Sequence, residues 1–185
     1  LFGGRLTAPL IERSEELKDI APRPVGTVFF PYSGSDANDS QIKLYWYASN
    51  PRGPTKKKKI LSRVKASHGS TLASASLTGL SNNYKSFDLP FDFVRYADCP
   101  HHYRNAEPGE SEIKFSKRMA ANLNALIERE GADTIAAMIA EPIMGAGGVI
   151  MPPDGYFDAI TRVLATNDIP LIDDEVITGF GRTGE

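Results

Sequence analysis

The chain has 185 residues, of which 41% are hydrophobic and 24% charged, and its formal net charge is −2. This length allows one domain with a real core, and the charge balance excludes a general attraction to nucleic acid or to anionic membranes. A single cysteine, Cys99, excludes an internal disulfide framework, and without a membrane-spanning apolar run or a secretory signal at the first residues we expect a cytoplasmic protein.

The N-terminal part of the chain predicts a helix, a short strand and a second helix in succession. Residues 8–20 place apolar side chains at helical spacing with charged side chains between them, and Thr7 can cap this helix. Residues 27–32 are β-prone. A turn of small polar residues at 33–39 follows and leads into a helical run that includes Trp46.

The turn at 33–39 has the features of an anion-binding site. Free backbone N–H groups and the positive end of the following helix point at one spot. Gly34 lets the backbone come close to a ligand, and the hydroxyls of Ser33 and Ser35 can donate hydrogen bonds. The alternative is an ordinary helix cap, which serine and aspartate also favour.

The middle of the chain continues the alternation of strand and helix. A lysine run at 56–59, interpreted as a solvated face, precedes a predicted strand at 60–64, and residues 70–78 predict a closely packed helix. Between the strand and this helix lies His68. It could face a ligand, although a lone histidine is more often structural.

A polar loop at 81–93 leads into a short predicted strand at 94–97. The next stretch is Cys99-Pro100-His101-His102-Tyr103. Its histidines are adjacent and have no spaced partner, so the stretch predicts a loop rather than a metal site.

Residues 111–130 predict a helix, with Ile113 and Phe115 among the side chains directed inward. The continuously apolar residues 134–140 predict a central parallel strand. This strand ends at the carboxylate of Glu141, which makes that residue a candidate for the site.

Asp154 is expected to cap the next helix, and a short buried strand that begins at Leu171 then runs into three consecutive acids. Open α/β sheets place their chemistry at the carboxyl ends of strands, so Asp173, Asp174 and Glu175 are candidates. The alternative is a strand that ends in solvated acids. Alternation along the whole chain predicts a mostly parallel α/β sheet with right-handed crossovers.

Three stretches together carry a family resemblance: Ser-Gly-Ser-Asp-Ala-Asn at 33–38, Ala-Glu-Pro at 140–142, and 171–184, which ends in Thr-Gly-Phe-Gly-Arg-Thr-Gly. In this order and separation they resemble the class III aminotransferases, pyridoxal-phosphate (PLP) enzymes of fold type I. The loop at 99–104 and the run at 141–149 look most like the ω-amino acid:pyruvate branch. The resemblance implies a large PLP-binding domain with a mostly parallel sheet flanked by helices.

The resemblance also implies an activity. An amino group would move from an amine or ω-amino acid to a keto acid such as pyruvate, in a homodimer whose partners are these small molecules rather than nucleic acid or membrane. Within the family, an aminomutase or a dialkylglycine decarboxylase remains an alternative. Outside it, the alternative is a non-catalytic interaction protein, whereas a NAD-binding domain is disfavoured because no G-x-G-x-x-G follows a strand.

Each matching residue acquires an expected role from the resemblance. Ser33, Gly34 and Ser35 would hold the cofactor phosphate. Asp174 would face the pyridine nitrogen and keep it protonated, so that the ring can accept electrons from the substrate. Val176 would pack on one face of the ring.

Ser67 and His68 occupy positions that bind the cofactor in the family, and Glu141 resembles a family glutamate near the site, a second candidate catalytic residue beside Asp174. Two residues depart from the family pattern. Ser67 replaces the usual aromatic residue that stacks on the cofactor ring, and serine cannot stack. Asp36 replaces the usual glutamate, which is a milder change.

The larger departure concerns a lysine. The lysine that forms a Schiff base with the cofactor is expected after Asp174, and no lysine follows Asp174 in this chain. We therefore expect residues 1–185 to be part of the PLP-binding large domain, without the N-terminal segment, the Schiff-base lysine segment and the C-terminal small domain. On this expectation the chain alone is inactive.

Overall fold

The computed structural model describes residues 7–21, 24–52 and 57–184, and the chain divides into two units, 1–32 and 33–185. In the first unit, α1 spans Ala8–Ile20, as predicted. Thr7 is its N-cap residue, although the Thr7 side chain makes no capping hydrogen bond, and no residue of α1 is buried.

The prediction of a strand at 27–32 is wrong, because these residues form no strand. β-prone residues become a strand only where a neighbouring strand pairs with their backbone, and propensity alone does not provide one. Phe29 and Tyr32 are exposed rather than packed on a sheet.

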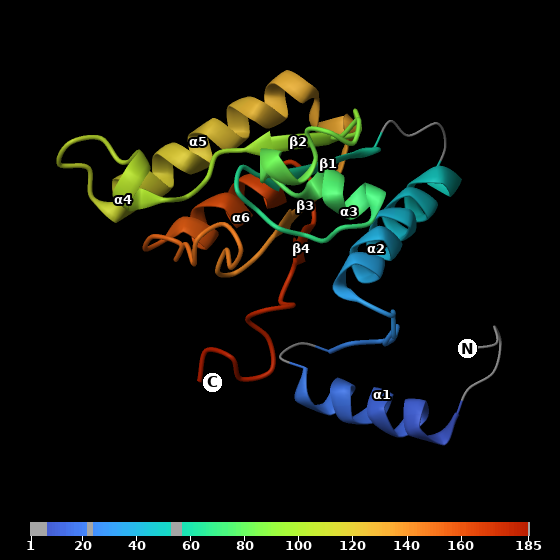
Figure 1. The fold of residues 1–185 in the computed structure, drawn as a ribbon. Helices are drawn as coiled ribbons and strands as arrows, with labels where there is room; N and C mark the ends of the chain where they lie inside the picture. The colour runs from blue at the N-terminus through green and yellow to red at the C-terminus, as the bar shows by residue number, and fades with distance from the viewer. Residues whose placement is uncertain (1–6, 22–23, 53–56, 185) are drawn as a thin grey trace. The chain divides into compact units, whose positions relative to one another are not determined.

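The second unit is built on four parallel strands. β1 spans Lys59–Arg63, β2 Val94–Ala97, β3 Ile135–Ala140 and β4 Leu171–Asp173. Their order across the sheet is β2-β1-β3-β4, and every pairing is parallel (Figure 1). The predicted parallel α/β architecture is confirmed.

Helices cover both faces of this sheet. α2, Gly34–Ser49, and α3, Leu72–Leu77, lie on one face, where Ile42 and Leu77 join a buried cluster with Ile60 of β1. Side chains of α2 and α3 therefore cover β1 on this face of the sheet.

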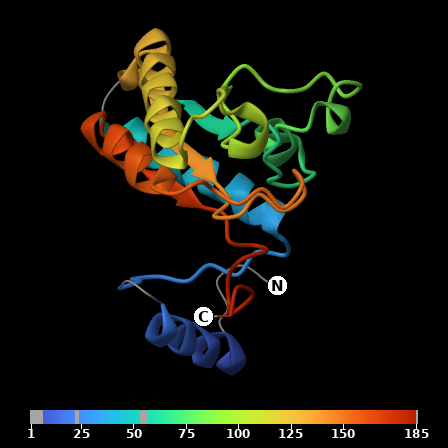
Figure 2. The same cartoon turned by 90° about the vertical axis from the view of Figure 1, so that its left-hand side faces the viewer.

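The other face is covered by α5, Glu112–Glu130, and α6, Tyr156–Thr166, which lie side by side (Figure 2). Phe115 and Ile160 join a second buried cluster with Leu61 of β1. Leu61 follows directly after the residue that packs on the opposite face, because successive side chains of a strand point to opposite sides of the sheet.

Two details of the helices differ from the prediction. α4, His102–Asn105, is a short helix within the predicted loop. α6 is capped not by Asp154 but by Gly155, which has a left-handed backbone with a φ of 74°. Asp154 instead connects the start of α6 to α5. Its N–H donates to Glu112 Oε2 and its carbonyl accepts from Ser116 Oγ, both at 2.8 Å.

The lysine run connects β1 to its neighbours. Lys57 pairs with Asp168 at 3.0 Å, and Lys59 pairs with Glu130 at 2.9 Å. The ammonium of Lys58 lies 5.9 Å from the centre of an indole ring. Besides facing solvent, these lysines therefore connect the start of β1 to α2, to the end of α5 and to the segment before β4.

Within the described part of the chain, no helix is both long and apolar enough to cross a bilayer, and no three His, Cys, Asp or Glu side chains gather as metal ligands would. Cys99 is buried, and burial raises the pKa of its thiol. A raised thiol pKa lowers the thiolate fraction, so Cys99 is expected to be a poor nucleophile.

Glu110 forms a two-point ion pair with Arg118 on α5. Arg118 Nε and Nη2 donate to Oε1 and Oε2 of Glu110 at 2.8 and 2.6 Å. The hydrogen bonds from Arg118 lower the pKa of Glu110 from 4.5 to about 2. Because the pKa is lower in the folded state, this carboxylate stabilises the fold above pH 4.5, and the contribution is lost as the pH falls toward 2.

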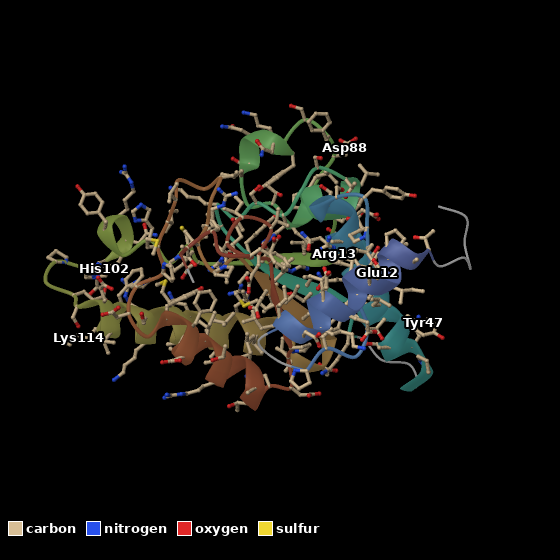
Figure 3. All side chains as sticks on the ribbon, turned by 90° about the horizontal axis from the view of Figure 1, so that it is seen from below. Glu12, Arg13, Tyr47, Asp88, His102 and Lys114 are labelled. Carbon is tan, nitrogen blue, oxygen red and sulfur yellow. The ribbon has the colours of Figure 1, made fainter. Side chains whose placement is uncertain are left out.

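We expect Glu110→Gln to lower the Tm at pH 7, and the Tm difference from wild type to shrink as the pH is lowered from 5 to 3. Thermal unfolding followed by circular dichroism at several pH values measures this. The matched control is Glu12→Gln on α1, an exposed carboxylate labelled in Figure 3. A difference for Glu110→Gln that does not change with pH would contradict the assignment.

Candidate functional site

The topology of the sheet places a crevice at the carboxyl ends of β1 and β3. After β1 the chain crosses through α3 to the neighbouring strand β2 on one side, and after β3 it crosses through α6 to the neighbouring strand β4 on the other side. The connections that leave neighbouring strands β1 and β3 therefore diverge, and such a switch point is where open α/β sheets bind ligands.

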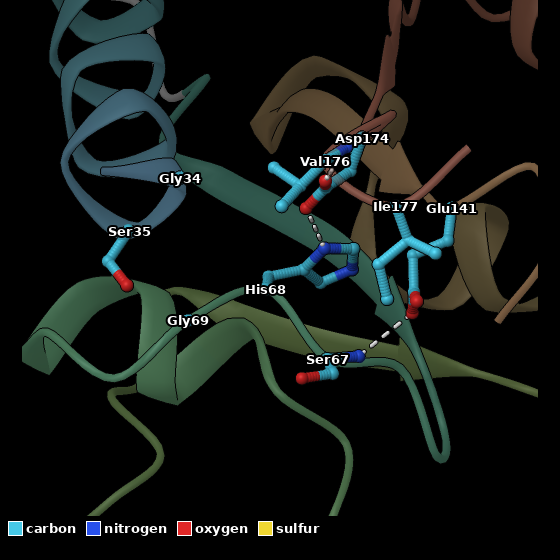
Figure 4. Close-up of a pocket in the computed structure, with 9 residues that line it drawn as sticks. All are labelled: Gly34, Ser35, Ser67, His68, Gly69, Glu141, Asp174, Val176 and Ile177. Atoms are coloured by element: carbon cyan, nitrogen blue, oxygen red, sulfur yellow. Dashed lines mark hydrogen bonds and ion pairs between the residues drawn. The ribbon is translucent and has the colours of Figure 1, made fainter. Parts of the chain in front are cut away.

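A pocket of about 230 Å³ lies in this crevice (Figure 4). It is formed by the turn after β1, the start of α2, and the residues that follow β3 and β4. Its lining residues are Gly34, Ser35, Ser67, His68, Gly69, Glu141, Asp174, Val176 and Ile177.

The start of α2 forms one wall of the pocket. Ser33 is the N-cap residue, and its hydroxyl accepts a hydrogen bond from the N–H of Asp36 at 3.2 Å. Ser33 is therefore used to begin the helix and does not line the pocket, whereas Gly34 and Ser35 do. The first N–H groups of a helix have no carbonyl partner within it, so this wall favours an anion.

The turn after β1 lies close against α2. The hydroxyl of Ser35 accepts from the N–H of Ser70 at 3.0 Å. Gly69 has a φ of +129°, and a Cβ at this position would lie 2.6 Å from Ser74 Oγ and 2.9 Å from the Cα of Ser35. Only glycine suits this close approach, so Gly69 fixes how the turn meets the helix.

Asp174, directly after β4, is buried and accepts three hydrogen bonds. His68 Nδ1 lies 2.7 Å and Asn38 Nδ2 lies 3.0 Å from Oδ2, and the N–H of Val176 lies 3.2 Å from Oδ1. Burial by itself raises the pKa of this carboxyl, but the hydrogen bonds from His68, Asn38 and Val176 lower it below its ordinary value. The pocket therefore contains a carboxylate that is ionised at neutral pH.

Glu141, directly after β3, joins the two loops that border the crevice. Its Oε1 accepts from the N–H of Ser67 and its Oε2 from the N–H of Gly145, both at 2.9 Å. The fully buried Arg63 donates from Nη2 to the Glu141 carbonyl at 2.6 Å. Glu141 is thus held from both its backbone and its carboxylate.

Two apolar side chains complete the pocket. Val176 is 71% exposed and Ile177 is 48% exposed, so both can contact a ligand. A Cβ on Gly34 would lie 2.8 Å from Val176 Cγ2, which shows how closely this segment approaches the start of α2.

Of the eight residues that the family resemblance places at the site, seven line the pocket, and Ser33 is the exception. The other two acids after β4, Asp173 and Glu175, do not line it. Sequence reasoning did not find Asn38, Gly69 and Ile177. Asn38 could have been found, because it lies one helical turn after Gly34 and therefore on the same side of α2. No periodic signal pointed to Gly69 or Ile177.

Residues 2–185 match the sequence profile of the family described as aminotransferase class-III. The chain belongs to this family. The family resemblance and the PLP-type α/β fold are confirmed, and class-III aminotransferases use pyridoxal phosphate.

Related proteins agree. The chain is 53% identical over 184 residues to gamma aminobutyrate transaminase 1, mitochondrial, of Solanum lycopersicum. The matched region covers 99% of this chain but 36% of that protein. Among solved structures, the omega transaminase from Pseudomonas jessenii in complex with PMP has a TM-score of 0.97 and 52% identity, with 100% of this chain and 41% of that chain covered. An omega-aminotransferase from Paracoccus denitrificans has a TM-score of 0.95 and 48% identity over the same shares. The chain thus spans well under half of its relatives.

The expectation of a cytoplasmic protein is wrong by this comparison. The relative above is named as mitochondrial, and gamma aminobutyrate transaminase 3 of Solanum lycopersicum, 52% identical to this chain over 184 residues, is named as chloroplastic. The composition of this class-III aminotransferase chain does not distinguish these compartments from the cytoplasm, because an organelle address is carried by a separate signal.

The pocket's chemistry fits PLP in three respects. The start of α2 suits a phosphate, and the ionised Asp174 suits a protonated ring nitrogen. Val176 and Ile177 offer apolar surface for a flat ring. In one respect the fit is incomplete, because Ser67 lines the pocket where an aromatic side chain would add stacking.

We therefore expect Ser67→Tyr to tighten PLP binding by this class-III aminotransferase. Aromatic stacking contributes about 0.5–1.5 kcal/mol beyond buried area, which corresponds to a roughly 2- to 10-fold lower Kd. Fluorescence titration of the complete protein with PLP measures this. Ser81→Tyr, outside the pocket, is the control, and an equal or weaker affinity of Ser67→Tyr would contradict the expectation.

Proposed function

We propose that the complete protein is a PLP-dependent transaminase that moves an amino group from an amine or ω-amino acid to a keto acid such as pyruvate. The observation that carries this proposal is the buried, ionised Asp174 in the same pocket as the start of α2. The names of the relatives, gamma aminobutyrate transaminases and omega transaminases, support this class of amino donor.

Each residue of the pocket has a proposed role. Gly34 and Ser35 would hold the cofactor phosphate at the start of α2, and Ser33 would contribute indirectly by fixing that helix end. Asp174 would accept a hydrogen bond from the protonated pyridine nitrogen and so keep that nitrogen protonated. When bound, PLP supplies a positively charged ring that withdraws electrons from the substrate's Cα.

The remaining residues would shape the pocket. Val176 and Ile177 would pack on the ring and exclude water from it, and Ser67 would lie beside it. Glu141 would act as a positioning residue, because its carboxylate already accepts hydrogen bonds from two backbone N–H groups. His68 would act through Asp174.

Two properties of the complete protein are also proposed. No lysine of the described residues lines the pocket, so the lysine that binds PLP would come from a segment outside this chain, and the 185-residue chain alone is expected to show no turnover. By analogy with the family, the complete protein would be a homodimer.

The test is an amino-transfer assay with the complete, PLP-loaded protein. γ-Aminobutyrate, β-alanine and 1-phenylethylamine serve as amino donors and pyruvate as acceptor, and formation of alanine is measured. Alanine formation with any of these donors supports the proposal. Release of CO₂ from a dialkylglycine, or isomerisation of an amino acid without a keto acid, would instead indicate the decarboxylase or the aminomutase, and absence of PLP binding would indicate a non-catalytic protein.

A further inference from the structure

Arg63, at the end of β1, is a buried cation that forms no ion pair with the described residues. It is 0% exposed, and none of the ion pairs of the described part of the chain includes it. Its Nε also has no hydrogen-bond partner there. A guanidinium stays charged in proteins, and burying an unpaired charge is costly, so the presence of Arg63 calls for a reason beyond packing.

Two aromatic rings and one carbonyl surround the guanidinium. Its central carbon lies 6.0 Å from the centre of the Tyr156 ring and 5.9 Å from that of the Phe157 ring, both at the start of α6. Its Nη2 donates to the carbonyl of Glu141 at 2.6 Å. Rings and carbonyls attract a cation but carry no net charge, so these contacts leave the positive charge of Arg63 uncompensated.

The residue that Arg63 contacts through its carbonyl also carries a negative charge. Glu141 is 4% exposed, and both oxygens of its carboxylate accept hydrogen bonds, from the N–H groups of Ser67 and Gly145. These donors are neutral, and no ion pair of the described residues includes Glu141. One side chain separates this carboxylate from the carbonyl that Arg63 contacts, so the two opposite charges lie close together behind the pocket wall, where they interact more strongly than in water.

The wall of the pocket itself is acidic. Glu141 and Asp174 line it, and no lysine or arginine is among its lining residues in the described part of the chain. A protonated ring nitrogen would offset Asp174, which leaves Glu141 as the charge that repels a ligand carboxylate. ω-Amino acids and keto acids carry a carboxylate, whereas a simple amine does not.

We propose that Arg63 is a specificity-determining residue whose buried charge offsets that of Glu141 and so lets the pocket favour substrates that carry a carboxylate. The inference rests on the proposed function, since it concerns which substrates the same pocket accepts. Arg63 does not line the pocket, so it acts through its charge and through Glu141 rather than by touching the substrate.

Two ligands that differ only in charge test this role. Butanoate has a carboxylate, and butanamide has the same carbon chain with an uncharged amide. Neither has an amino group, so both bind without turnover. Isothermal titration calorimetry on the complete, PLP-loaded protein gives the ratio of the Kd for butanamide to the Kd for butanoate, which is the preference for a carboxylate. Loss of pocket structure weakens both ligands and leaves this ratio unchanged.

Three substitutions predict different ratios. Arg63→Met removes the charge and keeps an unbranched side chain, and we expect it to lower the ratio roughly 4- to 15-fold, the Coulomb effect of a charge about 10 Å away at an effective dielectric constant of about 20 to 40. Arg63→Lys keeps the charge and is expected to keep most of the ratio. Glu141→Gln removes the opposing charge and is expected to raise the ratio.

The matched control is Arg129→Met on α5. It removes the same charge from a side chain that is 70% exposed and lies outside the pocket lining. Solvent and salt screen an exposed charge, so we expect the ratio of this variant to equal that of the wild type.

Each outcome decides the proposal. A lower ratio in Arg63→Met that Arg63→Lys retains supports it, and an unchanged ratio in Arg63→Met, or equal losses in both variants, overturns it. If Arg63→Met does not fold, Glu141→Gln decides alone, and a ratio that does not rise overturns the proposal. A wild type that binds butanoate no better than butanamide, or binds neither, also overturns it. If the wild type prefers butanoate but transfers no amino group, the proposed function fails, while the ratios still decide the role of Arg63.

Discussion

Asp174→Asn is expected to lower kcat/KM for amino transfer by the complete protein by roughly 10- to 150-fold, because a charge-assisted hydrogen bond contributes about 1.5–3 kcal/mol and 1.4 kcal/mol is a tenfold change. The carboxylate is buried and ionised in the pocket, and asparagine has no negative charge to stabilise a protonated pyridine nitrogen. Asparagine also presents an amide N–H₂ to the donors His68 and Asn38, which disturbs the hydrogen bonds around it.

Steady-state kinetics with saturating PLP measures this loss, since saturation separates it from weaker cofactor binding. Asp173→Asn is the matched control. It makes the same substitution one residue earlier. Neighbouring residues of an extended chain point to opposite sides, so the side chain of Asp173 is exposed and lies outside the pocket lining. Equal losses in both variants would contradict a specific role for Asp174.

Phe115→Ala is expected to lower the free energy of unfolding by about 3–5 kcal/mol, the usual cost of truncating a buried phenylalanine. Phe115 is 0% exposed and lies in the cluster between α5, α6 and the sheet. Its ring also lies edge-on to His102, at 5.3 Å between centres, and 5.0 Å from the guanidinium of Arg118. Alanine would remove these contacts and leave a cavity in the cluster that holds α5 and α6 on the sheet.

Urea denaturation of the complete protein without PLP measures this effect, because bound cofactor would stabilise the folded state by mass action and obscure it. Ile113→Ala is the control on the same helix. Ile113 was predicted to face inward but is 49% exposed, since two residues along a helix rotate the side chain by about 200° from Phe115. A loss for Phe115→Ala no larger than that for Ile113→Ala would contradict the assigned core.

The local patterns of the sequence were sufficient for most of the second unit. The continuously apolar run of β3 identified a central parallel strand, and the small-residue turn before α2 identified a helix start with a free end. Both signals are local, because burial on two faces excludes polar residues and a helix end needs particular residues to begin. The motifs at the start of α2 and at the ends of β3 and β4 could be assigned to a family for the same reason.

Other features depended on contacts between segments far apart in the chain. Whether 27–32 formed a strand depended on a pairing partner, which no local pattern reports. The sequence around Ser33 was compatible with an anion ligand or a helix cap, and the hydrogen bond from the N–H of Asp36 shows that it is the cap. The most consequential case is Asp174, which the sequence presents as one of three consecutive acids. The family resemblance implied a role for Asp174, but only the tertiary structure shows its physical basis. The order of the strands brings Asp174 beside His68 and Asn38, and their hydrogen bonds keep a buried carboxylate charged.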